Sequence, residues 1–488
     1  MSDALSLATL DAIPRDSAPG YDPRGVSVGA VHLGLGAFAR AHVCAYTDAV
    51  IARGDDRWGI VGTSQRSAAV PDALQPQDGL YAVLERDRDR PPRARVKGSV
   101  RRVACAAEDP LEVVRYVADP AVSVVTLTVT EKGYRSDFAT GRLRHDDAEV
   151  RADVDGRSPQ TVVGQLARGL ERRASTDAGP LAVVCCDNLT DNGPRLRQLV
   201  GDFVSTIDGG DALQDWIDAQ VAFPATMVDR IVPATTEADR HEAARLLGVA
   251  DAGTVVAEPF SQWVIEDAFT GPRPAWETVG ATLTDDVGAY EAVKLRLLNA
   301  THSLIAYLGA LAGYDTIDRA LEDPAIERAA RALVEQDQIP TVTPPPALDL
   351  GAYRDQVLSR FANPALGHRT TQVAMDGSQK LPQRVLVAVR TRRAGGGEPR
   401  LAALLVAAWM RFLLGHNDVG QRLDVSDPVA PSLVPLLESA GPFEATRYAL
   451  QSIAPDLAED TTFTQMVSDW FDALSRHGVQ EALAAMDT

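Results

Sequence analysis

The sequence predicts a protein of two domains: an α/β domain with a doubly wound parallel sheet over residues 1–285, and a mainly α-helical domain over residues 286–488. In the first half, short β-branched and apolar runs alternate with helical stretches, which is typical of a parallel sheet covered by helices. A glycine-rich turn follows the first of these runs. From about residue 286 onward, apolar residues recur at helical spacing.

Four runs in the first half are expected to be strands of one sheet. VSVGAVHL, residues 26–33, leads into the tripeptide GLG, after which AFARAHVCAYTDAVIARG is expected to be one helix. WGIVGTS, from Trp58, is the second predicted strand. VSVVTLTVT (Val122 to Thr130) and LAVVCCDN, from Leu181, are rich in apolar and β-branched residues, which suits strands buried on both faces. In the second half, YEAVKLRLLNATHSLIAYLGALAG and RLAALLVAAWMRFLLGH are expected to be helices.

Composition limits the classes of function. With 488 residues, 45% of them hydrophobic, the chain can bury a large core. Its formal net charge of −19 argues against general binding to nucleic acid or anionic membranes, whose phosphates would repel it. The four cysteines form no CxxC pair and no zinc pattern, so we expect reduced thiols and no metal site. No leader-like start or apolar run of about 18 residues is present, so a cytoplasmic location is expected.

The glycine-rich turn has the pattern G-x-G-x-x-A, between a predicted strand and a predicted helix. Glycines let the backbone turn tightly and approach a pyrophosphate closely, and the first turn of the helix offers free N–H groups. We therefore expect dinucleotide binding, with Gly34, Gly36, Ala37 and Phe38 next to the cofactor. An ordinary tight turn is the alternative.

The end of the second predicted strand bears on the choice of nicotinamide cofactor. It reads TSQRS, residues 63–67, without the carboxylate that binds the ribose 2′-hydroxyl of NAD in many such folds. Ser and Arg side chains tolerate the 2′-phosphate of NADP, so Arg66 is a candidate cofactor-binding residue. A solvated surface charge is the alternative for Arg66, and these residues alone leave both NAD and NADP open.

Lys294, Asn299 and His302, in KLRLLNATH, are the candidates for chemistry in the second half. On a regular helix Asn299 lies roughly 140° and His302 roughly 80° around the axis from Lys294, so all three share one side. A lysine withdrawn from water can act as a general base, an amide can stabilise a developing alkoxide, and an imidazole can orient a hydroxyl. With a nicotinamide as the hydride acceptor, such a trio needs no metal to oxidise a secondary alcohol. A surface lysine beside a core Asn and His has the same spacing.

Polar groups also follow other predicted strands. Asp187-Asn188 and the segment EKGY, residues 131–134, each end a strand, where α/β sheets bind their ligands. FPATMVDRIVP, residues 223–233, indicates a shaped loop between two prolines. Within it, Asp229 and Arg230 form either part of a site or a structural ion pair.

Six motifs in this order resemble the mannitol dehydrogenase family of polyol-specific long-chain dehydrogenases: HLGLGAFARAH, TLTVTEKGY, CDNLTDNG, FPATMVDRIVP, EPFSQWVIED and KLRLLNATHS. The resemblance covers nearly the whole chain, from about Val31 into the C-terminal region. It implies an N-terminal Rossmann-type domain, a helical C-terminal domain and a site where the two meet. It also implies an NAD-dependent enzyme that uses no metal, acts on a small sugar acid or polyol and works as a monomer.

The resemblance assigns roles to individual residues. It implies that Lys294 is the general base, that Asn188 and Asn299 form the oxyanion-stabilising pair, and that His302 contacts substrate hydroxyls. Asp229 would help to shape the substrate site, and Arg40 belongs to the motif that resembles the cofactor loop. Glu291, three residues before Lys294, matches a position that passes the proton to solvent; a plain acid on the helix surface is its alternative.

Residues 368–384, HRTTQVAMDGSQKLPQR, resemble the fructuronate reductase branch of the family, the D-mannonate oxidoreductases. A carboxylated substrate needs a cation nearby, and the candidates are His368, Arg369, Lys380 and Arg384. Each of these can instead hold a helix end or a neighbouring carboxylate. The expected reaction is reduction of D-fructuronate by NADH to D-mannonate. The alternatives are a mannitol 2-dehydrogenase or an arabinitol-type polyol dehydrogenase and, in another class, a nicotinamide-binding sensor or scaffold.

Overall fold

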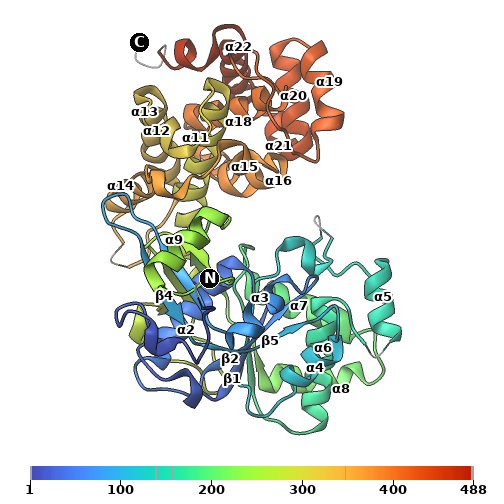
Figure 1. The fold of residues 1–488 in the computed structure, drawn as a ribbon. Helices are drawn as coiled ribbons and strands as arrows, with labels where there is room; N and C mark the ends of the chain where they lie inside the picture. Colours follow the sequence, from blue (N-terminus) through green and yellow to red (C-terminus); the bar gives the residue numbers. More distant parts are fainter. Residues whose placement is uncertain (1–2, 138–139, 157, 347, 485–488) are drawn as a thin grey trace. The chain divides into compact units, whose positions relative to one another are not determined.

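The computed structural model describes residues 3–137, 140–156, 158–346 and 348–484. They form two compact units, Met1–Val287 and Gly288–Thr488. The first, in blue to green in Figure 1, contains strands and helices, and the second, in yellow to red, is built of helices. No helix in the described ranges is both long and apolar enough to cross a lipid bilayer.

Six parallel strands form the central sheet of the first unit. In chain order they are β1 (Val28–Leu33), β2 (Gly59–Ser64), β5 (Val100–Cys105), β6 (Val124–Leu127), β7 (Leu181–Cys185) and β8 (Val221–Ala222). Their order across the sheet is β5-β2-β1-β6-β7-β8, and every neighbouring pair is parallel. This is the 3-2-1-4-5-6 order of the doubly wound, Rossmann-type sheet, so the predicted α/β fold is confirmed. The order reverses between β1 and β6, where such folds bind their ligands.

Helices cover both faces of this sheet, because successive side chains of a strand point to opposite faces. The covering helices are α2 (Val43–Ile51), α4 (Pro110–Val117), α6 (Val162–Ser175), α7 (Asn192–Val204) and α8 (Gly210–Gln220). Val31 and Val125 pack in one cluster with side chains of α4, α6 and α7. Their chain neighbours Ala30 and Val124 pack on the other face with side chains of α2.

Two boundaries differ from the sequence prediction. The single helix expected after the glycine turn is broken at His42 into α1 (Ala37–Ala41) and α2. The His42 ring is fully buried there, stacks on Phe38 with 5.0 Å between ring centroids, and lies 2.9 Å from the carbonyl oxygen of Gln262. The strand expected to continue to Thr130 ends at Leu127, and Thr130 itself adopts a φ of +70°, which is incompatible with a strand.

Two three-stranded sheets that the sequence did not predict complete the first unit. One has the order β10-β3-β4, from β3 (Tyr81–Glu85), β4 (Arg93–Lys97) and β10 (Val255–Ala257). The other has the order β12-β11-β9, from β9 (Thr226–Asp229), β11 (Gln262–Glu266) and β12 (Thr282–Thr284). The short helices α3 (Ala69–Leu74), α5 (Ala148–Asp155) and α9 (Glu237–Leu247) lie in the connections.

The second unit confirms the predicted helical domain. Its helices are α10 (Val287–Val293), α11 (Ala300–Ala312), α12 (Ile317–Leu321), α13 (Pro324–Ala332), α14 (Leu350–Phe361), α15 (Thr370–Ala374), α16 (Gly377–Leu381), α17 (Val387–Ala394), α18 (Arg400–Leu413), α19 (Ala430–Ser439), α20 (Pro442–Ile453), α21 (Pro455–Ala458) and α22 (Thr461–Ala484). Helix α18 is buried on nearly all sides and packs against α11 and α22, which identifies it as the centre of this unit's core.

Candidate active site

The glycine turn lies at the carboxyl end of β1, beside the point where the strand order reverses. Gly34 has a φ of +95°, and a Cβ atom there would lie 2.2 Å from the carbonyl oxygen of Thr128, so this position requires glycine. At Gly36 the nearest atom to a Cβ would be 3.8 Å away, and this residue is exposed. The turn therefore presents open backbone that a pyrophosphate can approach closely, which fits a dinucleotide.

The other residues expected near the cofactor have different surroundings. Ala37 and Phe38 are half-buried in the first turn of α1. Arg40 is buried, donates to the carbonyl oxygen of Gly253 at 2.5 Å, and lies 5.7 Å from the centre of the Tyr81 ring. These contacts hold the helix that follows the glycine turn against the interior of the first unit. Arg66 is exposed in the loop that follows β2.

His32, which the sequence analysis did not single out, lies directly below the glycine turn. Its ring is fully buried, with Nδ1 at 2.7 Å from Thr126 Oγ1 and Nε2 at 2.9 Å from Thr128 Oγ1. Burial lowers the pKa of His32 to about 4, so the imidazole is neutral near pH 7. Because Nε2 also lies 3.2 Å from the carbonyl oxygen of Gly34, this histidine supports the backbone of the turn.

We expect His32 to make stability fall on acidification. Its pKa is about 4 in the folded chain and near 6.5 when unfolded, so the unfolded chain binds more protons between these values. The free energy of unfolding therefore falls as pH drops through this window, by about 3 kcal/mol in total. Urea denaturation at pH 7 and pH 5.5 should show roughly 1 kcal/mol more loss in the wild type than in His32→Gln. Equal losses would contradict the assignment.

Asn188 and Asp229 lie in different parts of the first unit, one in a loop and the other at the end of a strand. Asn188 is exposed and follows β7, between Asp187 and Asn192, which are both buried. Asp229 is the last residue of β9 and is 6% exposed. Its neighbour Arg230 forms an ion pair with Glu85 at 2.8 Å, so the structure gives Arg230 a different acidic partner from the one considered in the sequence.

Lys294 and Asn299 begin and end a π-helical turn between α10 and α11. The amide of Ala300 donates to the carbonyl oxygen of Leu295, five residues back. The angles expected for a regular helix are therefore wrong, because this wider turn sets Asn299 one turn above Lys294. Lys294 is 8% exposed and Asn299 is 7% exposed, which excludes the alternative of a surface lysine. Single π turns inside α-helices occur frequently at functional sites.

His302, on the next turn, is part of a basic cluster in the second unit. We define this basic cluster as His302, Arg360, His368, Lys380 and Arg384. The His302 ring stacks on Phe361 at 4.4 Å and meets the edge of the His368 ring at 4.9 Å. Burial, followed by electrostatic repulsion from the other four members, lowers the pKa of His302 well below its usual value. Burial and Lys380 also lower the pKa of His368.

Hydrogen bonds to backbone carbonyl oxygens and to a serine side chain hold two cations of the basic cluster. Lys380 Nζ, on α16, donates to the carbonyl oxygen of Met375 at 2.5 Å. Arg384 Nη1 donates to Ser303 Oγ at 3.1 Å and lies 3.5 Å from the carbonyl oxygen of Asn299. The structure thus brings His302, His368, Lys380 and Arg384 together, whereas the sequence offered the last three only as separate candidate cations. The sequence analysis missed Arg360 and Phe361, at the end of α14, because nothing in their local pattern distinguishes them from other helical residues.

Two other candidate residues, Arg369 and Glu291, do not belong to the basic cluster. Arg369 precedes α15, and its side chain is exposed. Glu291 is half-buried on α10. In the parts of the chain that the structure describes, no group of three or more His, Cys, Asp or Glu side chains is arranged to hold a metal ion.

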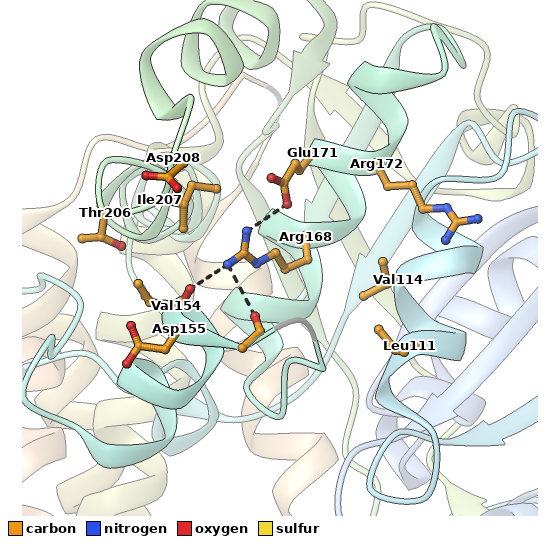
Figure 2. A pocket seen from close by; sticks show the side chains of 11 residues that line it. Leu111, Val114, Val154, Asp155, Arg168, Glu171, Arg172, Thr206, Ile207 and Asp208 are labelled. Atoms are coloured by element: carbon orange, nitrogen blue, oxygen red, sulfur yellow. Dashed lines mark hydrogen bonds and ion pairs between the residues drawn. The ribbon is translucent and has the colours of Figure 1, made fainter.

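One open cavity in the first unit lies apart from all of these residues. It has a volume of about 680 Å³ and is lined by side chains of α4 and α6 and by the segment after α7 (Figure 2). Arg168 donates into its wall, to the carbonyl oxygen of Val154 at 2.8 Å and to Glu171 at 2.9 Å. None of the predicted site residues lines this cavity.

Comparison with known proteins identifies the family. Residues 28–278 match the model of the mannitol dehydrogenase Rossmann domain, and residues 286–475 match the mannitol dehydrogenase C-terminal domain. The chain is 40% identical to an uncharacterised oxidoreductase of Escherichia coli (strain K12), over 96% of each chain. It is 38% identical to the D-mannonate oxidoreductase of the same organism, over 96% of this chain and 97% of the relative.

A solved structure gives the same result. Pseudomonas fluorescens mannitol 2-dehydrogenase, in a ternary complex with NAD and D-mannitol, matches with a TM-score of 0.89 and 33% identity. The match covers 99% of both chains. The chain therefore belongs to the mannitol dehydrogenase family.

Proposed function

We propose that this oxidoreductase interconverts D-fructuronate and D-mannonate with NAD(H). The observation that carries the proposal is the basic cluster around His302. The cations of this cluster, Arg360, Lys380 and Arg384, favour a carboxylate beside His302. A neutral ketose gains nothing from these charges. The relationship to a D-mannonate oxidoreductase supports the same substrate class.

The cofactor is assigned to the first unit. We propose that Gly34, Gly36, Ala37 and Phe38 hold the pyrophosphate, braced by Arg40, and that Arg66 faces the adenosine ribose. NAD is favoured because the related Pseudomonas enzyme binds it; the absence of a carboxylate in TSQRS leaves NADP as a secondary cofactor. When bound, the nicotinamide accepts the hydride in alcohol oxidation and supplies it in ketone reduction.

The proton and the reacting oxygen are assigned to Lys294 and two amides. In alcohol oxidation, Lys294 Nζ takes the hydroxyl proton while the adjacent carbon loses hydride and the C–O bond becomes a carbonyl. In reduction, the protonated amine returns that proton to the oxygen. The side-chain amides of Asn188 and Asn299 stabilise the partial negative charge on this oxygen. Glu291 passes the proton from Lys294 to solvent, and Asp229 and His302 orient the remaining hydroxyls.

A mannitol 2-dehydrogenase is the second candidate. The match with Pseudomonas fluorescens mannitol 2-dehydrogenase over 99% of both chains favours it. On this reading the members of the basic cluster hold helix ends, as the bonds from Lys380 and Arg384 to backbone and Ser303 atoms allow. The two candidates differ in how kcat/KM for D-fructuronate and for D-fructose should change when one cation of the basic cluster is removed.

Lys380→Met is expected to lower kcat/KM for D-fructuronate by about 10- to 100-fold, because a charge-assisted hydrogen bond contributes roughly 1.5–3 kcal/mol. The value for D-fructose should change far less, because it has no carboxylate. Arg319→Ala is the matched control: it removes an exposed cation elsewhere in the second unit and should change neither value. Equal losses for both substrates in Lys380→Met would contradict recognition of a carboxylate by this residue.

A further inference from the structure

A buried carboxylate joins two loops at the carboxyl edge of the central sheet. Asp187 is 9% exposed and follows β7. Its Oδ1 accepts from the amide of Thr130 at 2.8 Å. Its Oδ2 accepts from the amide of Val129 at 3.0 Å and from the Tyr134 hydroxyl at 2.5 Å. Three donors in the loop after β6 thus converge on one side chain from the loop after β7.

The segment that Asp187 holds is strained. Thr130 has φ +70° and ψ 157°, a conformation that β-branched residues rarely adopt. Such strain persists only where the surroundings enforce it, and it is concentrated at functional sites. The bond from the Thr130 amide to the carboxylate is one contact that enforces it. Burial also raises the pKa of Asp187, against the effect of its three donors, so the carboxylate is retained here at a cost in desolvation.

The backbone of Asp187 is held by a second set of hydrogen bonds, which involve Asn192. Its carbonyl oxygen accepts from Asn192 Nδ2 at 3.1 Å. Asn192 is 1% exposed and exchanges two hydrogen bonds with the backbone of Thr226, both of 2.9 Å. Asn188 lies between these two anchored residues, with its own side chain exposed. The backbone that carries the Asn188 amide is therefore held at both ends by buried bonds.

We propose that Asp187 is a positioning residue, which holds the backbone of Asn188 in the orientation that its side-chain amide needs to stabilise the reacting oxygen. The inference rests on the role proposed above for Asn188. Asp187 acts through Asn188 and through the loop after β6, and it does not itself touch the substrate. Its effect on the rate should therefore disappear when the Asn188 amide is absent.

A double-mutant cycle tests this dependence. Asp187→Asn has the same shape, but its amide cannot accept from all three donors, so kcat with NADH and D-fructuronate should fall about 10- to 100-fold. The dissociation constant of NADH, from quenching of tryptophan fluorescence, should change less than about threefold. In the Asn188→Ala background the same substitution should lower kcat less than about threefold.

The outcomes separate the two ideas. If Asn188→Ala lowers kcat but Asp187→Asn lowers it by the same factor in both backgrounds, the positioning role is wrong and the role of Asn188 stands. If Asn188→Ala leaves kcat unchanged, the proposed role of Asn188 fails and the positioning role fails with it. Unchanged kcat in Asp187→Asn alone also overturns the inference.

Two further variants distinguish a specific effect on kcat from a general loss of stability. Tyr134→Phe removes a single bond to Asp187 and should give a smaller loss of kcat with the same dependence on Asn188. Asp153→Asn is the matched control, because Asp153 is 1% exposed and also accepts from two backbone amides and one hydroxyl, those of Gln160 and Thr161. It should lower the melting temperature and leave kcat per NADH-binding site unchanged. A comparable loss of kcat in Asp153→Asn would show that the effect of Asp187→Asn is only structural.

Discussion

Lys294→Ala should lower kcat for ketone reduction and for alcohol oxidation by about 10² to 10⁴, the range for loss of a positioned acid or base. The side chain is 8% exposed at the start of a π turn, so water cannot readily replace it. The dissociation constant of NADH should change little, because the residues assigned to the cofactor lie in the first unit. Stopped-flow measurement of NADH oxidation, with NADH binding measured separately, distinguishes these quantities.

The pH dependence gives a second readout for Lys294. In the wild type, kcat/KM for alcohol oxidation should rise with pH as the base loses its proton, and this step should be absent in Lys294→Ala. Glu291→Gln, one helical turn earlier, should retain the step while lowering the rate less, because solvent can accept the proton in its place. Near-normal turnover in Lys294→Ala would remove this residue from its assigned role.

Gly34→Ala should destabilise the first unit by roughly 2–5 kcal/mol and abolish NADH binding in the same step. The added methyl group would lie 2.2 Å from the carbonyl oxygen of Thr128, and the backbone has a φ of +95°. Neither conflict can be relieved without moving the turn away from β6. Thermal unfolding and NADH titration of the purified variant measure the two effects.

Gly36→Ala separates cofactor binding from folding. The added methyl group would have only the Gly34 carbonyl oxygen within 4 Å, at 3.8 Å, so the melting temperature should stay within about 2 °C of the wild type. The affinity for NADH should still fall about 10- to 100-fold, because the methyl group occupies the space that the pyrophosphate needs. Gly25→Ala, at another open glycine, should change neither quantity. Unchanged affinity in Gly36→Ala would place the pyrophosphate elsewhere.

Four strands of the large parallel sheet, β1, β2, β6 and β7, could be predicted because they are local features of the sequence, whereas β5 and β8 were not predicted. Runs such as LAVVCCDN are almost wholly apolar, and burial on both faces requires such runs. The two small sheets were missed because their strands have three to five residues, and β4 alternates exposed arginines with buried residues at a sheet edge. Short strands of this kind depend on partners distant in the sequence, so local pattern does not distinguish them from loops.

Candidate site residues could be named from the sequence, but their geometry could not. The π turn from Lys294 to Asn299 leaves the apolar pattern of the helix intact, so spacing alone suggested a regular helix. The hydrogen bonds of His32 to two threonines, and those of the Asp187 carboxylate, join groups 53 to 96 positions apart, which meet only once the strands pair. Arg360 joins the basic cluster from a helix with no distinguishing motif.

A comparison of a charged with an uncharged substrate is the most direct test of the proposed function. The measurement is the rate of NADH consumption by the purified full chain with D-fructuronate and with D-fructose, at matched concentrations and ionic strength. The basic cluster predicts that kcat/KM for D-fructuronate is at least about 100-fold larger, and that raising the salt concentration narrows the difference. A preference for D-fructose would contradict the account, identify a mannitol-type dehydrogenase, and leave the cations around His302 with structural roles only.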